Sequence, residues 1–132
     1  MDFRFWIVDW KIAMNEAMFK QRTKNLALNT IKLIEQLPKN KTSDIIGRQL
    51  LRSATSVGAN YRAACRGKST ADLIAKLAIV EEEADETIYW MELLTESGNS
   101  NTLKQELQDL MKDANEITAM TVASIKTLRN RK

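Results

Sequence analysis

Four arginines within residues 48–66 have the type and spacing that suit binding of an anionic group. If this segment is helical, with about 100° between successive residues, Arg48, Arg52, Arg62 and Arg66 fall within an arc of about 80°. The stripe then extends for about 27 Å at 1.5 Å per residue, comparable to several phosphates along one nucleic-acid strand. A guanidinium group binds phosphate or carboxylate through two parallel hydrogen bonds, so the spacing suits either partner.

The second half of the sequence offers carboxylates within the same protein. Residues up to Lys68 include 13 Lys and Arg against 5 Asp and Glu, whereas residues from Ser69 onward include 7 against 12. Acids lie beside the apolar stripe of residues 70–97 at Glu81, Asp85, Glu92 and Glu96, with Glu82 and Glu86 further round. Binding of nucleic acid and pairing with these acids, across a helix contact or a subunit contact, are both open, and exposed charges usually pair or stay solvated.

The sequence lacks the residues that most enzymes and metal sites require. It contains no histidine, and Cys65 is its one cysteine, which excludes Ser-His-Asp and Cys-His arrangements, histidine or clustered-cysteine metal sites and an internal disulfide. Ser53 and Ser56 have no base to activate a hydroxyl, and the run 81–86 lacks the Glu-x-x-His motif of di-iron bundles. We therefore predict a non-enzymatic protein without metal or cofactor. The single cysteine favours a reducing, cytoplasmic setting.

Four amphipathic segments must position the charged residues, and each has helical spacing. We expect the first to start at Asn15 and end at Pro38, and the second to be capped by Thr42, Ser43 or Asp44 and to end at Gly67. We expect the third to run from a capping box at Ser69–Asp72 to Gly98, and the fourth to follow the turn at residues 99–101.

Apolar residues recur every three or four positions along these segments. The expected core residues are Phe19, Leu26, Ile31, Ile34 and Leu37; Leu50, Ala54, Val57, Tyr61 and Ala64; Leu73, Leu77, Val80, Ala84, Thr87 and Met91; and Leu103, Leu107, Leu110, Ala114, Ile117, Thr121, Ser124 and Leu128. Short connections between long helices predict an all-α fold, an antiparallel up-down-up-down four-helix bundle over residues 15–132.

Residues 1–14 differ from the rest, because Phe3, Phe5, Trp6 and Trp10 crowd into a short stretch. The stretch is too short and too charged to span a membrane, which needs about 20 apolar residues, and it lacks the features of a signal peptide. An interfacial or self-association segment is one interpretation. We favour an atypical aromatic-rich N-terminal extension that precedes a natural start at Met14.

Three large side chains of the third segment, Tyr89, Trp90 and Leu93, lie outside its apolar stripe. Large apolar side chains outside a core most often contact another chain, so these residues predict an oligomer interface. The alternative is a wide core face that reaches round to the fourth helix.

Two long stretches carry a resemblance to a known family: Gln49–Ala64, which reads QLLRSATSVGANYRAA, and Ile79–Leu94, which reads IVEEEADETIYWMELL. With the Leu-Pro-Lys turn at residues 37–39, they resemble the four-helix-bundle proteins encoded in intervening sequences of bacterial 23S ribosomal RNA genes, over about residues 15–128. One common branch has Asn-Ile-Ala-Glu where this chain has Asn-Tyr-Arg-Ala at residues 60–63, so an acid of that branch is missing here.

The resemblance implies ring-like homopentamers, and a related branch is the accessory protein of diversity-generating retroelements, which binds nucleic acid and a reverse transcriptase. We therefore predict a homo-oligomer that binds RNA or DNA through the arginine stripe of the second helix, by backbone contacts that read little sequence. The alternative is a structural or adaptor bundle that recruits a protein partner, with the charged stripes serving only helix or subunit pairing.

Overall fold

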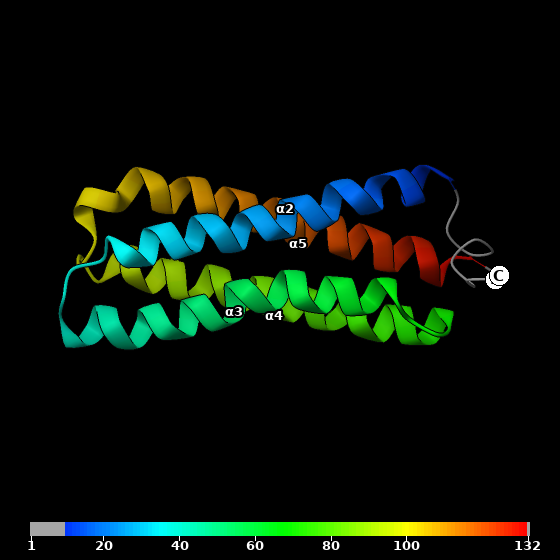
Figure 1. The fold of residues 1–132 in the computed structure, drawn as a ribbon, viewed down its shortest axis with the longest axis horizontal. Coiled ribbons are helices and arrows are strands. Elements are labelled where there is room, and N and C mark those ends of the chain that lie inside the picture. The colour runs from blue at the N-terminus through cyan, green and yellow to red at the C-terminus, as the bar shows by residue number, and fades with distance from the viewer. Residues whose placement is uncertain (1–9, 132) are drawn as a thin grey trace.

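The chain folds into four long helices. The computed structural model describes residues 10–131, with side chains from Glu16 onward. In chain order the elements are α2 (Trp10–Glu35), α3 (Lys41–Cys65), α4 (Thr70–Glu96), a short 3₁₀ turn η1 (Asn101–Leu103) and α5 (Lys104–Arg129). The chain reverses direction at each connection, and residues 10–131 contain no strand (Figure 1). The predicted all-α four-helix fold is confirmed. No helix in this range combines the length and apolar character that crossing a bilayer requires.

Two helix starts differ from those expected. Helix α2 begins at Trp10 instead of Asn15, because residues 10–14 contain no glycine, proline or capping residue that would begin the helix later. The rest of the predicted extension, residues 1–9, lies outside the described residues. Helix α3 is capped by Asn40 instead of Thr42, Ser43 or Asp44. Asn40 has extended backbone angles, and its side chain accepts a hydrogen bond from Ser43 N at 2.8 Å.

The start of α4 follows the expected capping pattern. Ser69 is the N-cap, and its hydroxyl accepts from Asp72 N at 3.0 Å. The Asp72 carboxylate accepts from Lys68 N, one residue before the N-cap, at 3.0 Å, and from Lys76 Nζ at 2.9 Å. These contacts, with Lys76 the larger cause, lower the pKa of Asp72 below its ordinary value of 3.8.

We expect Asp72→Asn to lower the midpoint of thermal unfolding at pH 7, because the ionised carboxylate binds both the Lys68 backbone N–H and the Lys76 ammonium group. A carboxyl whose pKa is lower in the folded state stabilises the fold above its unfolded-state pKa, and the stabilisation disappears as the pH falls through the folded-state pKa. The midpoints of wild type and variant should therefore converge in acid, whereas the exposed Glu82→Gln control should follow wild type throughout. A wild-type to variant difference that is constant with pH would contradict this role.

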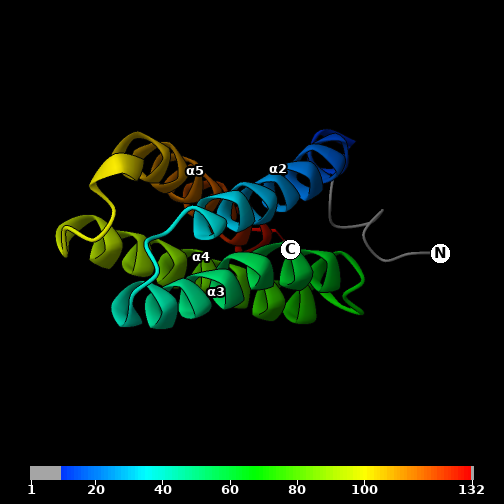
Figure 2. The ribbon, with the colours of Figure 1, turned by 60° about the vertical axis from the view of Figure 1, so that its left-hand side comes forward.

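The four helices lie in two layers, α2 with α5 and α3 with α4 (Figure 2). Every core residue predicted for α4 is buried, as are those predicted for α3 except the half-buried Tyr61. The α2 prediction was partly wrong: Ile31 is exposed, and the core positions are Phe19, Thr23, Leu26, Thr30 and Leu33. The threonines keep the spacing of three and four but carry no strong apolar signal. In α5, Ile125 is buried where Ser124 was expected.

Small residues of α3 allow close contact with its neighbours. A Cβ atom at Gly58 would lie 3.3 Å from Thr23 Oγ1, and one at Gly47 would lie 3.3 Å from Leu37 Cδ1, both on α2 or at its end. On the other side, buried Thr87 Oγ1 of α4 lies 3.0 Å from Ser53 Oγ. These contacts fix the register of α3 against both helices, and so decide what surrounds each arginine.

Candidate nucleic-acid interface

All four predicted arginines of α3 are exposed on one side of the helix, but their surroundings differ. Near the start of α3, Arg48 Nη2 lies 3.0 Å from Asp44 Oδ2, one turn earlier on the same helix. The Arg48 side chain is nevertheless 78% exposed. Such an exposed pair contributes little to stability and leaves the arginine able to meet another anion.

Arg52 is instead paired across the α3–α4 contact. Its guanidinium group contacts the Glu86 carboxylate and lies 3.7 Å from Glu83 Oε1. The expected acidic partners Glu81, Asp85, Glu92 and Glu96 form none of the described ion pairs with the stripe. Thr87 of α4 lies against Ser53 of α3. This register brings Glu86 and Glu83, one and four positions before Thr87, next to Arg52. At this position the pairing interpretation is correct.

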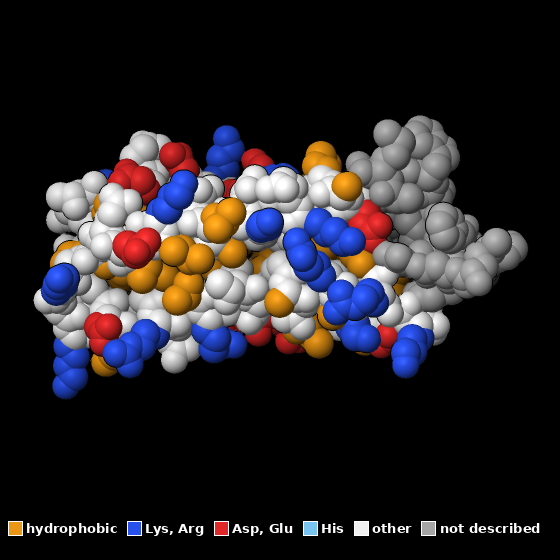
Figure 3. Space-filling model, viewed as in Figure 1, with side chains coloured by type: hydrophobic (Ala, Val, Ile, Leu, Met, Phe, Trp, Pro, Cys, Tyr) orange, Lys and Arg blue, Asp and Glu red, His pale blue; other side chains and the backbone are white. Residues whose placement is uncertain are grey.

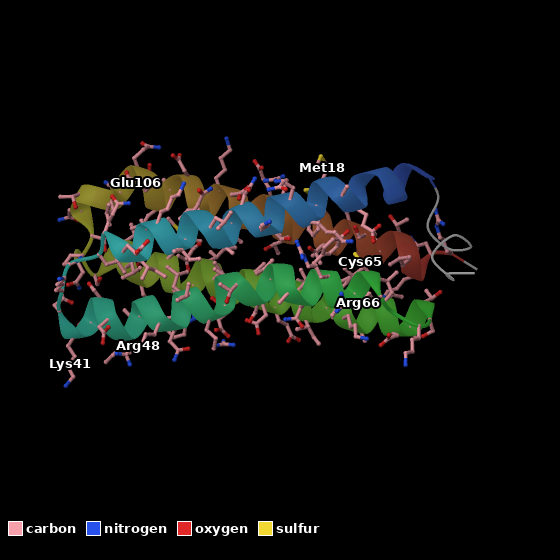
Figure 4. All side chains as sticks on the ribbon, viewed as in Figure 1. Met18, Lys41, Arg48, Cys65, Arg66 and Glu106 are labelled. Atoms are coloured by element: carbon pink, nitrogen blue, oxygen red, sulfur yellow. The ribbon has the colours of Figure 1, made fainter. Side chains whose placement is uncertain are left out.

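Arg62 and Arg66 lie at the other end of α3. Neither forms an ion pair with any acid whose side chain the structure describes. Asp72 at the start of α4 lies beside Gly67 at the end of α3, but its carboxylate already accepts from Lys68 N and Lys76 Nζ. Figure 4 shows Arg48 and Arg66 near opposite ends of α3. The stripe is therefore divided into a paired half and an exposed half without acidic partners among these residues.

Helix α2 brings two lysines beside this second half. The rings of Phe19 and Tyr61 stack edge to face with centroids 4.5 Å apart, so residues 19–24 of α2 run alongside residues 57–62 of α3. Lys20 follows Phe19, whose ring packs on Tyr61, and precedes Thr23, which lies against Gly58, so Lys20 flanks the α3 side of its helix.

Lys24 lies one turn further along the same side of α2, and it is exposed. We call Lys20, Lys24, Arg62 and Arg66 the basic surface. Figure 3 shows Lys and Arg side chains gathered on this half of the molecule, over α2 and the end of α3. The lysines were missed in the sequence, because they belong to a different helix and their proximity depends on the α2–α3 register.

Arg22, also missed in the sequence, has a structural role on the other side of α2. Its guanidinium group contacts Asp113 and, at 2.9 Å, Glu116 Oε1 on α5. The hydrogen bond to Asp113 is the main cause that raises the pKa of Arg22. The pairing satisfies these acids and removes Arg22 from the set of cations available to a ligand.

The predicted interface residues of α4 divide in a similar way. Tyr89 is 51% exposed, and its ring packs edge to face on Trp90 at 5.1 Å. Trp90 is half-buried against the core, and its Nε1 donates to Glu86 Oε2 at 3.1 Å. Leu93 is half-buried. Trp90 thus fits the wide-core alternative, whereas Tyr89 remains an exposed ring that the bundle itself does not cover.

No group of three or more potential metal-ligating side chains occurs in the described part of the chain. The fold and the basic surface together define a class of protein: a small four-helix bundle with exposed cations on α2 and at the end of α3. The chain belongs to the family of 23S rRNA-intervening sequence proteins, whose model matches residues 15–123. The family resemblance seen in the sequence is confirmed.

One solved structure similar to this chain is that of a protein of unknown function from the S23 ribosomal protein family of Bacteroides thetaiotaomicron VPI-5482. The two chains are 32% identical and superpose with a TM-score of 0.77, over 85% of this chain and 98% of the other. No curated protein matches the chain.

Proposed function

We propose that the protein is a non-enzymatic, homo-oligomeric bundle that binds RNA or DNA through the basic surface. The observation that carries this proposal is the presence of Arg62 and Arg66 without acidic partners among the described side chains, beside Lys20 and Lys24. Cations that satisfy no internal acid stay solvated with mobile counterions, and a phosphate backbone displaces those counterions with a gain in entropy.

The expected recognition is electrostatic. Phosphates would occupy the basic surface, and affinity would come from counterion release more than from base edges. With about four phosphate contacts for each protomer, the logarithm of the binding constant should fall with the logarithm of salt concentration with a slope of about −3.6. The one cysteine, buried and unpaired, supports a reducing compartment such as the cytoplasm.

Fluorescence anisotropy of labelled RNA and DNA between 50 and 200 mM KCl tests this function. We expect binding that weakens about 150-fold over this range, as a slope near −3.6 requires. A salt slope near zero, or no binding at the lowest salt concentration, would refute the electrostatic interface.

A second function, as an adaptor that recruits a protein, is favoured by the Arg52 pairs with Glu83 and Glu86. These ion pairs show that part of the arginine stripe joins α3 to α4. If nucleic acid does not bind, the basic surface would instead form ion pairs with the carboxylates of an acidic protein partner.

Self-association is the third part of the proposal, and Tyr89 with Leu93 is its predicted contact. Tyrosine is enriched among the few hot-spot residues of interfaces, whose truncation costs about 2 kcal/mol or more. We expect Tyr89→Ala/Leu93→Ala to weaken assembly about 30-fold or more, measured by light scattering across a dilution series. Glu92→Ala, between them and exposed, serves as the control. A wild-type protein that is monomeric at micromolar concentration would eliminate this interface.

A further inference from the structure

The contact between α2 and α3 leaves large apolar side chains exposed near the turn that joins the two helices. A Cβ atom on Gly47 of α3 would lie 3.3 Å from Leu37 Cδ1 and 3.8 Å from Ile34 Cγ2. Because the helices are antiparallel, one turn back from Ile34 and one turn forward from Gly47 reach the same level, which places Ile31 beside Leu51. Ile31 is 38% exposed and Leu51 is 36% exposed.

These side chains belong to a continuous apolar surface. We call it the apolar strip, and it consists of Leu28, Ile31, Ile34, Leu37 and Leu51. Leu28, one turn before Ile31, is 45% exposed. An open cavity of about 490 Å³ lies at one end of the strip, with Ile34, Leu37 and Leu51 in its wall. Figure 3 shows hydrophobic side chains gathered over α2 and α3 on this half of the molecule, next to the Lys and Arg side chains of the other half.

Cations lie at both ends of the apolar strip. Lys24 is exposed seven positions before Ile31 on the same side of α2, about 10 Å away along the helix. The cavity at the other end is lined by five charged residues, Glu35, Lys39, Lys41, Asp44 and Arg48. Cations outnumber acids in this set, and Asp44 is already paired with Arg48. The strip is therefore an apolar surface with positively charged ends.

The outer face of α4 carries the opposite charge around its exposed ring. Four exposed acids lie three, four or seven positions from Tyr89, on the same side of the helix: Glu82, Asp85, Glu92 and Glu96. None of them takes part in a described ion pair. The one Lys or Arg of α4 is Lys76, which is bound by Asp72 at the helix start. Tyr89, with Leu93 one turn later, thus has acids for about 10 Å along the helix in both directions.

This charge limits how Tyr89 can contact a second copy of the chain. If the α4 face met itself, the acids of each copy would lie opposite those of the other, and like charges placed opposite one another oppose association. The apolar strip offers an apolar centre for Tyr89 and Leu93, with cations at a similar distance on both sides. Each exposed ion pair contributes little by itself, so the common sign selects the surface while apolar burial supplies the affinity.

From these observations we infer that the α4 face of one protomer docks on the apolar strip of another, with Tyr89 and Leu93 against Ile31. This inference rests on the self-association in the proposed function and names the two surfaces of that contact. Because the surfaces differ, each protomer offers one of each, and the contact propagates in one direction, as in a ring or an open chain. The cations of the basic surface other than Lys24 lie further from the strip and stay open to phosphate.

Substitution within the apolar strip tests the inference. Leu28→Glu/Ile31→Glu places two carboxylates where the acids of α4 would approach, so assembly of the full chain should weaken at least 30-fold, measured by light scattering across a dilution series. Ala119→Glu/Val122→Glu introduces the same charges with the same spacing at exposed positions of α5 and should change assembly less than threefold. Circular dichroism verifies that both variants fold.

The outcomes separate the inference from the proposed function. Assembly of Leu28→Glu/Ile31→Glu to the same extent as wild type would overturn the inference but leave self-association through Tyr89 intact. A wild-type protein that is monomeric at micromolar concentration would overturn both.

A mixture of two variants distinguishes a contact between unlike surfaces from one between like surfaces. Leu28→Glu/Ile31→Glu keeps its α4 face, and Tyr89→Ala/Leu93→Ala keeps its apolar strip. At a concentration at which wild type assembles and neither variant does, the mixture should form one-to-one dimers and nothing larger, because one intact contact remains. Absence of these dimers would refute docking of the α4 face on the strip.

Discussion

The double variant Arg62→Ala/Arg66→Ala is expected to bind nucleic acid about 30-fold more weakly than wild type at 100 mM KCl. Each exposed contact between an arginine and a phosphate contributes about 1 kcal/mol under such screening, and two contacts together correspond to about 30-fold. The salt slope should become shallower by about 2, because two fewer counterions are released. Salt-dependent anisotropy titrations measure both quantities. Neither side chain takes part in a described ion pair, so the fold should be unaffected.

Arg52→Ala is the matched control, since it removes the same group from the same side of the same helix. Its guanidinium group is already engaged by Glu86 and Glu83, so its loss should change nucleic-acid affinity less than threefold. The cost should instead appear in stability, at up to about 1 kcal/mol, because the pair is partly exposed and screened. An equal loss of affinity in both variants would show that the paired half of α3 binds as strongly as the exposed half.

Leu50→Ala should lower the free energy of unfolding by about 2–5 kcal/mol, the largest stability effect expected for a single substitution on α3. Leu50 is fully buried in the core cluster, so truncation loses apolar burial and leaves a cavity. The neighbouring Leu51→Ala serves as the control. Leu51 is 36% exposed, and its truncation should cost about 1 kcal/mol or less.

Urea unfolding followed by circular dichroism measures both costs, at one fixed protein concentration because assembly contributes to apparent stability. Similar costs for Leu50→Ala and Leu51→Ala would contradict the register of α3 in the bundle. That outcome would also remove the basis for placing the arginines on the outer side.

The fold was predictable where strongly apolar residues follow the helical period. In α4, every predicted core residue is buried, because leucine, valine and methionine there leave one orientation favourable. In α2 the period passes through Thr23 and Thr30, whose apolar character is weak, so apolar spacing alone points to Ile31, which is exposed. A threonine can occupy a core when its hydroxyl bonds to the preceding turn, as Thr23 does with Lys20 O at 3.1 Å.

The candidate site was predictable only in part, for a related reason. Helical periodicity alone places all four arginines on the outer side of α3, since angles around one helix follow from sequence spacing. Which arginine meets an acid depends on the register between helices, and that register is set by contacts such as Gly58 against Thr23. The division between Arg52 and Arg62, and the approach of Lys20, therefore required the structure.

Cys65 is buried at the end of α3, beside the basic surface. Its rate of alkylation therefore reports local opening of the structure at this place. Burial, followed by a hydrogen bond with Glu16, raises the pKa of its thiol to about 11, so at neutral pH almost none is present as the reactive thiolate. Alkylation is therefore expected to be slow in the folded protein and to become faster when the end of α3 opens locally. The chain has no second cysteine. Mass spectrometry of its modification by a maleimide would therefore measure opening around Cys65 without any engineered label.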